Sequence, residues 1–103
     1  MKVIWNGVMP AVTTTFTKDD TLDMNMFATN IAAQLDAGVS GIILGGTLGE
    51  ASTLTDSEKK TLITETVSLV EGKVPVIINI AEQTTTGAID AALKAEKYGA
   101  NGL

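Results

Sequence analysis

The chain has 103 residues and a net charge of −5, and it contains neither cysteine nor histidine. Disulfides, thiolate metal sites and every Ser-His or Cys-His catalytic arrangement are therefore excluded within it. All seven basic residues are lysines and they form no basic stretch, so nucleic acid is not an expected partner. No apolar run reaches the roughly 20 residues that a membrane span needs, and we expect a cytoplasmic protein without a membrane partner.

The first predicted elements are a buried strand and an amphipathic helix. Residues 7–14 are mostly apolar, as in a strand covered on both faces, although Pro10 cannot donate to a ladder. A helix is expected to begin at about Asp23, its N-cap, and to end at Gly38. Its buried face is predicted from apolar residues at every fourth position: Phe27, Ile31 and Leu35.

A second strand and a second helix follow, separated by a glycine-rich loop. Residues 41–44 form the short apolar strand, which runs directly into the loop at residues 45–50. Thr55 and Glu58 match a capping box and predict the start of the helix, which Gly72 ends. Its predicted buried face consists of Leu62, Ile63, Val67 and Val70.

A third strand is predicted over residues 74–80, and a third helix begins at a threonine within residues 84–86 and ends at Gly99. The predicted buried stripe of this helix is Ile89, Ala92 and Leu93. The helix-to-strand junction at residues 36–42 is echoed at residues 97–103, which predicts the opening of a fourth strand.

Alternating strands and helices indicate an α/β fold with a parallel sheet. A natural domain rarely ends two residues into a buried strand, so we expect the sequence to be a truncated domain. The alternative is a small three-stranded α/β unit.

The loop after the second strand is the best candidate for a binding site. In parallel α/β folds function collects at the carboxyl ends of the strands, here residues 13–16, 45–50 and 81–83. Glycines allow backbone amides to approach an anion, and Thr47 adds a hydroxyl donor. The spacing fits neither a dinucleotide fingerprint nor a P-loop. A glycine turn without a ligand and a site for a small carboxylate both remain open.

Residues 46–54 resemble the signature Gly-Thr-Thr-Gly-Glu-Ser-x-x-Leu of the dihydrodipicolinate synthase and N-acetylneuraminate lyase superfamily. Residues 7–16, 35–41 and 74–77 resemble the family's first strand, first helix end and third strand, in the same order. The resemblance implies a parallel (β/α)8 TIM barrel. This chain, residues 1–103, would supply the N-terminal part of that single domain: three strand–helix units and the start of a fourth strand.

The resemblance also implies a function. The family's members are Schiff-base-forming lyases of the class I aldolase, dehydratase or synthase type, acting on pyruvate or another 2-oxo acid without a metal or other cofactor. The parent is expected to be a homo-oligomer, a dimer or tetramer. The substrate carboxylate would be bound at Gly46, by the Thr47 hydroxyl and by the Leu48 amide, with Gly49 and Glu50 supporting the loop.

The chain departs from the family pattern at Leu48, which stands where the second loop threonine is usual. A leucine side chain cannot relay a proton, which counts against dihydrodipicolinate synthase activity in the parent. The family's Schiff-base lysine and its tyrosine belong to the sixth and fifth strands, so no catalytic residue is expected here and the fragment alone is expected to be inactive. A non-catalytic α/β binding or assembly module, completed by a partner chain, is the alternative.

Overall fold

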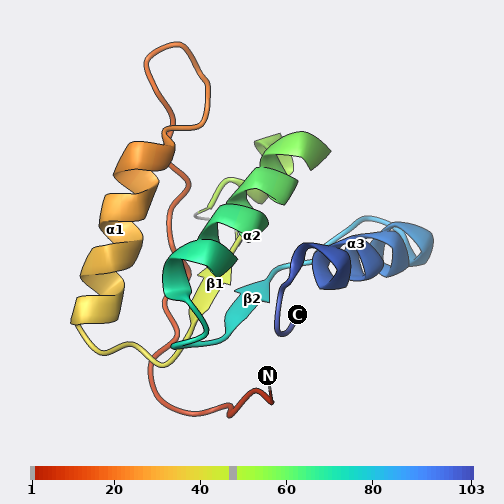
Figure 1. Cartoon of the computed structure of the whole chain (residues 1–103). Helices are drawn as coiled ribbons and strands as arrows, with labels where there is room; N and C mark the ends of the chain where they lie inside the picture. Colours follow the sequence, from red (N-terminus) through yellow and green to blue (C-terminus); the bar gives the residue numbers. More distant parts are fainter. Residues whose placement is uncertain (1, 47–48) are drawn as a thin grey trace.

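A computed structural model describes residues 2–46 and 49–103 of the chain. Its elements, in chain order, are α1 (Met24–Asp36), β1 (Ile42–Leu44), the 3-10 helix η1 (Ala51–Thr53), α2 (Asp56–Val70), β2 (Val76–Ile78) and α3 (Thr85–Tyr98). In Figure 1, α2 lies between α1 and α3, and it packs against both of them and against β2. The predicted α/β alternation is therefore confirmed from the first helix onward.

The sheet is parallel and short. β1 and β2 pair in register, with Ile42 opposite Val76 and Leu44 opposite Ile78. One isolated parallel bridge flanks the pair on each side: Ala11 bridges to Ile43, and Gly102 bridges to Ile77. Four segments of the chain thus run in the same direction, in sequence order.

The predicted strand over residues 7–14 is confirmed only at Ala11, and the rest of it is wrong. The Ile43 amide donates to the Pro10 carbonyl at 2.9 Å, and the Val12 amide donates to the Ile43 carbonyl at 3.0 Å. Pro10 has no amide hydrogen of its own, so the regular ladder is interrupted there, although the Ser40 amide still donates to the Val8 carbonyl at 2.7 Å. The third strand is likewise shorter than predicted and covers only Val76–Ile78.

The helix boundaries follow the predicted capping chemistry. The Asp23 carboxylate accepts from the Met26 amide at 3.0 Å, and Thr84 caps α3 through the Gly87 amide at 2.9 Å. At the start of α2, the Thr55 hydroxyl accepts from the Glu58 amide at 3.1 Å. The Glu58 carboxylate in turn accepts from the Thr55 amide at 2.9 Å, which completes the capping box.

The core lies between the helices and the sheet, and it contains the predicted faces of α1 and α2. Its most deeply buried side chains are Phe27, Ile31, Ile42, Leu44, Leu62, Val70 and Val76. Leu35 and Val67 pack against this cluster and are partly buried.

The predicted buried stripe of α3 is wrong. Ile89 is 58% exposed and Leu93 is 64% exposed, whereas Ala95 is buried and Tyr98 packs against the core. The helix carries apolar residues on more than one side, and only the side that carries Ala95 and Tyr98 meets the core. Periodicity finds an apolar stripe but does not say which stripe meets a neighbouring element.

Thr66 is fully buried in α2, and its hydroxyl has no hydrogen-bond partner among the described residues. A buried polar group without a partner destabilises the folded state. We expect Thr66→Val, which keeps the shape and removes the hydroxyl, to raise the free energy of unfolding by about 1–2 kcal/mol. Urea denaturation of both proteins measures this difference, and a destabilised valine variant would show that the hydroxyl is satisfied in solution.

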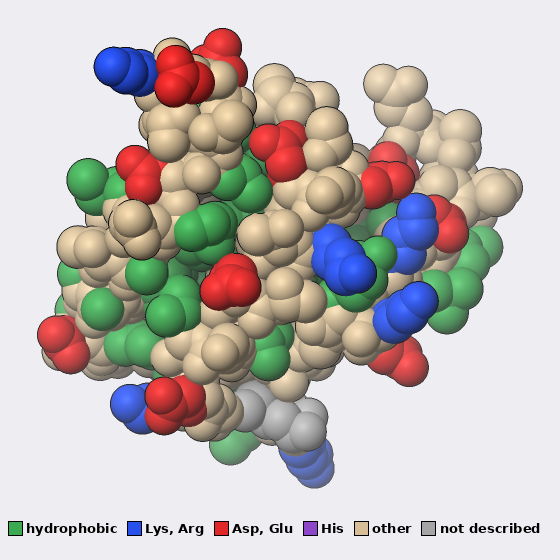
Figure 2. All heavy atoms as spheres, turned by 45° about the horizontal axis from the view of Figure 1, so that its top comes forward, with side chains coloured by type: hydrophobic (Ala, Val, Ile, Leu, Met, Phe, Trp, Pro, Cys, Tyr) green, Lys and Arg blue, Asp and Glu red, His purple; other side chains and the backbone are tan. Residues whose placement is uncertain are grey.

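The described part of the chain contains neither a membrane-spanning helix nor a cluster of metal ligands. No helix there combines the length and the apolar character needed to cross a membrane. Residues 2–46 and 49–103 also contain no group of three or more side chains suited to hold a metal ion. On the face shown in Figure 2, lysines are interspersed with acidic side chains and form no extended basic surface.

Candidate functional site

The loop that follows β1 begins with a buried, left-handed glycine. Gly45 has φ +66°, a conformation that glycine adopts without steric strain. The Gly46 carbonyl then accepts from the Gly49 amide at 3.0 Å and from the Ala51 amide at 3.3 Å. Thr47 and Leu48 lie outside the described residues, so their contacts with a carboxylate remain predictions.

Thr14 joins the first predicted segment to this loop. Its buried hydroxyl donates to the Gly49 carbonyl at 2.5 Å, across 35 positions of sequence. The segments at residues 13–16 and 45–50, both expected at the carboxyl ends of the strands, therefore meet. A side-chain hydrogen bond joins them here, rather than a strand ladder.

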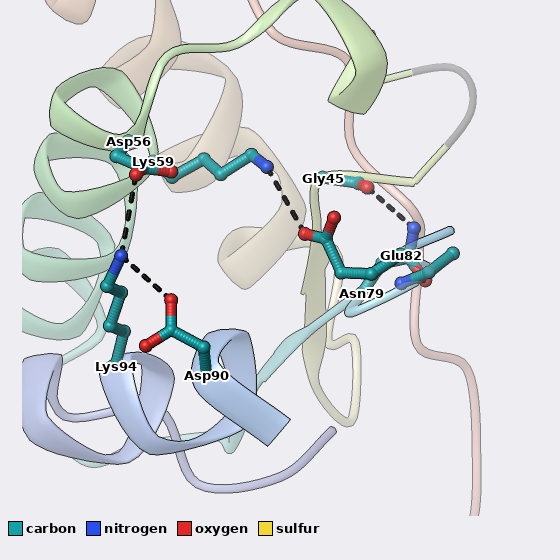
Figure 3. A network of polar contacts seen from close by, with 8 residues as sticks. Gly45, Asp56, Lys59, Asn79, Glu82, Asp90 and Lys94 are labelled. Carbon is teal, nitrogen blue, oxygen red and sulfur yellow. Dashed lines mark hydrogen bonds and ion pairs between the residues drawn. The ribbon is translucent and has the colours of Figure 1, made fainter. Parts of the chain in front are cut away.

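Asn79 joins the third segment to the same loop. Its backbone amide donates to the Leu44 carbonyl at 3.0 Å, and its side-chain Nδ2 donates to the Gly45 carbonyl at 2.9 Å (Figure 3). Its side-chain Oδ1 accepts from the Ala81 amide at 3.2 Å. The sequence analysis missed Asn79 as a site residue, although a polar amide directly after the apolar strand β2 was a usable signal.

Gly49 lies close to the backbone of the first segment and of its own loop. A Cβ atom added there would lie 3.1 Å from the Val12 carbonyl oxygen and 3.3 Å from the backbone nitrogens of Gly45 and Gly46. All three are backbone atoms, which cannot move aside as the end of a side chain can. The structure thus gives a steric reason for glycine at this position, and the role of Gly49 in supporting a carboxylate-binding loop stays a prediction.

Glu50 is exposed and adopts φ +58° at the start of η1. Its carbonyl accepts from the Thr53 hydroxyl at 2.8 Å and from the Thr53 amide at 2.9 Å, and its side chain does not cap the turn. In the described contacts Glu50 shapes the loop through its backbone, and the predicted support from its side chain remains a prediction.

A groove of about 500 Å³ opens beside the loop. It is lined by Ala51, Ser52, Leu54, Lys59, Asn79, Ala81, Glu82, Gln83 and Thr84. The Lys59 ammonium lies 3.7 Å from the Glu82 carboxylate at the edge of this groove (Figure 3). The groove therefore contains one basic side chain, and that side chain already has an acidic partner.

Lys94 on α3 is also paired with carboxylates. Its Nζ lies 3.0 Å from Asp90 and 3.4 Å from Asp56, which connects α3 to the start of α2 (Figure 3). The hydrogen bond to Asp90, followed by the negative charge of Asp56, raises the pKa of Lys94 above its ordinary value. A Schiff-base amine needs a lowered pKa, so Lys94 is unsuited to that role.

Known proteins with sequences similar to this chain include enzymes of one family. Residues 5–103 match the model of the dihydrodipicolinate synthetase family. The chain is 38% identical to a 4-hydroxy-tetrahydrodipicolinate synthase of Thermotoga neapolitana, over 97% of this chain and 34% of that protein. It is 34% identical to a probable 2-dehydro-3-deoxy-D-pentonate aldolase of Escherichia coli, over 96% of this chain and 33% of that protein.

A solved structure of a protein from the same family has a similar fold. The fold resembles that of an Escherichia coli prophage protein of the dihydrodipicolinic acid synthase family, crystallised in complex with pyruvate, with a TM-score of 0.87 and 31% identity. The match covers 96% of this chain and 33% of that structure. The chain thus spans about a third of the length of the curated relatives it matches.

Proposed function

The chain belongs to the dihydrodipicolinate synthetase family, and from this premise we propose that it forms the carboxylate-binding part of a Schiff-base lyase acting on pyruvate or another 2-oxo acid. The observation that carries the proposal is the glycine loop after β1, fixed by Thr14 on one side and Asn79 on the other. The loop lies at the carboxyl ends of parallel strands, where α/β enzymes bind their substrates.

The chemistry of the loop suits a small carboxylate. Backbone amides and a hydroxyl, held in place before the ligand arrives, bind an anion without the cost of reordering the loop. We assign the hydroxyl to Thr47 and one amide to Leu48, with Gly46 next to them. The chain itself would bind and orient the 2-oxo acid, while the amine of the Schiff base would come from a lysine outside these 103 residues.

The architecture of the whole enzyme is part of the proposal. We propose that the chain forms the N-terminal third of a (β/α)8 barrel, in which the strand edges at Ala11 and Gly102 pair with further strands, and that the barrel assembles as a homo-oligomer. Because a leucine side chain at position 48 cannot relay a proton, an aldolase or dehydratase reaction is favoured over that of a synthase. No metal is assigned to the reaction, because the residues proposed to bind the carboxylate are backbone amides and a hydroxyl rather than metal ligands.

A second candidate is an assembly module without catalysis. It is favoured by the exposed apolar side chains Leu93 and Leu103, which line a groove together with Gly102, and by the exposed Ile89 on the same helix as Leu93. Such a module would have no affinity for 2-oxo acids, so a ligand titration separates the two candidates.

We expect Thr47→Val to weaken pyruvate binding by about 1–3 kcal/mol, because a hydroxyl that donates to a charged carboxylate would be lost. Titration of the labelled chain with pyruvate, followed by NMR, measures the dissociation constant. Thr29→Val is the matched control, since Thr29 is exposed on α1 and bonds only to its own helix at the Asn25 carbonyl among the described residues. Equal affinities of the two variants would remove Thr47 from the site, and a wild-type chain without saturable binding would contradict the proposed function.

A further inference from the structure

We infer that Asn79 is a positioning residue that sets the direction of the Gly46 amide, and this inference rests on the proposed binding of a carboxylate by the loop. Asn79 is the residue directly after β2, and its side chain reaches across to the end of β1 (Figure 3). It would act on the ligand through the backbone of the loop.

The left-handed conformation of Gly45 leaves its carbonyl outside the regular ladder, so this carbonyl needs another hydrogen-bond donor. Up to Leu44 the carbonyls are bonded by the regular ladder, which ends where the Asn79 amide donates to the Leu44 carbonyl. At φ +66° the chain turns out of the sheet, and the buried Gly45 carbonyl is bonded by the Asn79 side chain instead. A buried carbonyl without a donor would destabilise the turn.

Fixing this carbonyl also fixes the next amide. The peptide between Gly45 and Gly46 is planar and trans, so its carbonyl and its N–H point to opposite sides of one rigid unit. When the Gly45 carbonyl is held by Asn79, the Gly46 N–H is directed away from Asn79. This is the preorganised backbone donor that an anion requires.

The other end of the loop is held in the same way. The Thr14 hydroxyl donates to the Gly49 carbonyl. The side-chain Oδ1 of Asn79 accepts from the Ala81 amide. A side-chain amide supplies the donor for Gly45 and the acceptor for Ala81 on two separate atoms. Asn79 therefore links the loop to the segment at residues 81–84 that lines the groove.

The test is Asn79→Asp, which keeps the shape and the acceptor but replaces the donor with a charged oxygen facing a carbonyl. Gln83→Glu is the matched control, because it adds the same charge to the same groove and leaves the bond to Gly45 intact. If the aspartate variant does not fold, Asn79→Ala replaces it in the test, because it removes the side-chain bonds to Gly45 and Ala81 without adding charge. Each chain is titrated with pyruvate, and amide hydrogen exchange is measured at Gly49, whose amide donates to the Gly46 carbonyl, together with the melting temperature.

We expect Asn79→Asp to bind pyruvate about tenfold more weakly than Gln83→Glu and to exchange the Gly49 amide about tenfold faster, while the amides of the core strands keep their protection. Equal affinity and equal exchange at Gly49 in the two variants would overturn the inference, and so would a uniform loss of protection throughout the chain. If the wild-type chain does not bind pyruvate, the proposed function fails, whereas the exchange at Gly49 still decides the role of Asn79.

Discussion

Replacing Phe27 with alanine is expected to lower the free energy of unfolding by about 3–5 kcal/mol, the usual effect of removing a buried aromatic ring. Phe27 is 1% exposed and belongs to the cluster that joins α1 to the sheet and to α2. Domains of this size have a total stability of about 5–15 kcal/mol, so the loss would leave a large part of the chain unfolded near physiological temperature. Urea denaturation followed by circular dichroism measures the change.

Met26→Ala is the control for this substitution, because Met26 precedes Phe27 on the same helix and is 50% exposed. It removes a large apolar side chain at a similar helix position, and we expect a change of less than about 1 kcal/mol. Alanine has the higher helix propensity at both positions, so similar losses in the two variants would contradict the view that burial of the Phe27 face stabilises α1.

Local chemistry explains which parts of the fold could be predicted from the sequence. Capping depends on residues three apart, so Thr55 with Glu58 and Asp23 with Met26 determine the helix starts without help from the rest of the chain. The apolar faces of α1 and α2 were also predictable, because each helix has one dominant stripe and a neighbour to receive it.

The features that sequence analysis got wrong depend on distant neighbours. The segment at residues 7–14 has the composition of a strand, yet whether it pairs along its whole length depends on register with β1 and on the missing donor of Pro10. On α3 the choice between the side of Leu93 and the side of Ala95 depends on which elements pack around the helix. Composition and period do not contain that information.

The candidate site, too, was predictable from the sequence only in part. The glycine spacing identified the loop after β1, and the parallel pattern placed it at the functional edge of the sheet. The contacts that hold it come from Thr14 and Asn79, which lie 35 and 34 positions away from their partners in the sequence. Such pairs follow from the register of the strands, which the sequence alone left open.

Gly49→Ala is expected to lower the free energy of unfolding by about 1–3 kcal/mol and to weaken binding at the loop, because overpacking against rigid backbone is destabilising. The new methyl group would lie 3.1 Å from the Val12 carbonyl oxygen and 3.3 Å from the Gly46 nitrogen. It would compete with a ligand for the space around the Gly46 amide and would also separate the segments that Thr14 holds together. Urea denaturation and pyruvate titration measure the two effects.

Gly46→Ala tests whether this sensitivity is steric, with stability as the readout. Among the described residues, a Cβ atom at Gly46 would meet only the Ala11 side chain, at an ordinary distance of 3.8 Å. We therefore expect the stability of Gly46→Ala to fall by less than about 1 kcal/mol, within the range of a tolerated substitution. If the two variants are destabilised equally, the close approach at Gly49 does not govern the loop, and flexibility of the glycine backbone would have to explain both results. If only Gly49→Ala is destabilised, the loop owes its shape to the backbone that surrounds Gly49, which is the condition for amides that are already in place when an anion binds.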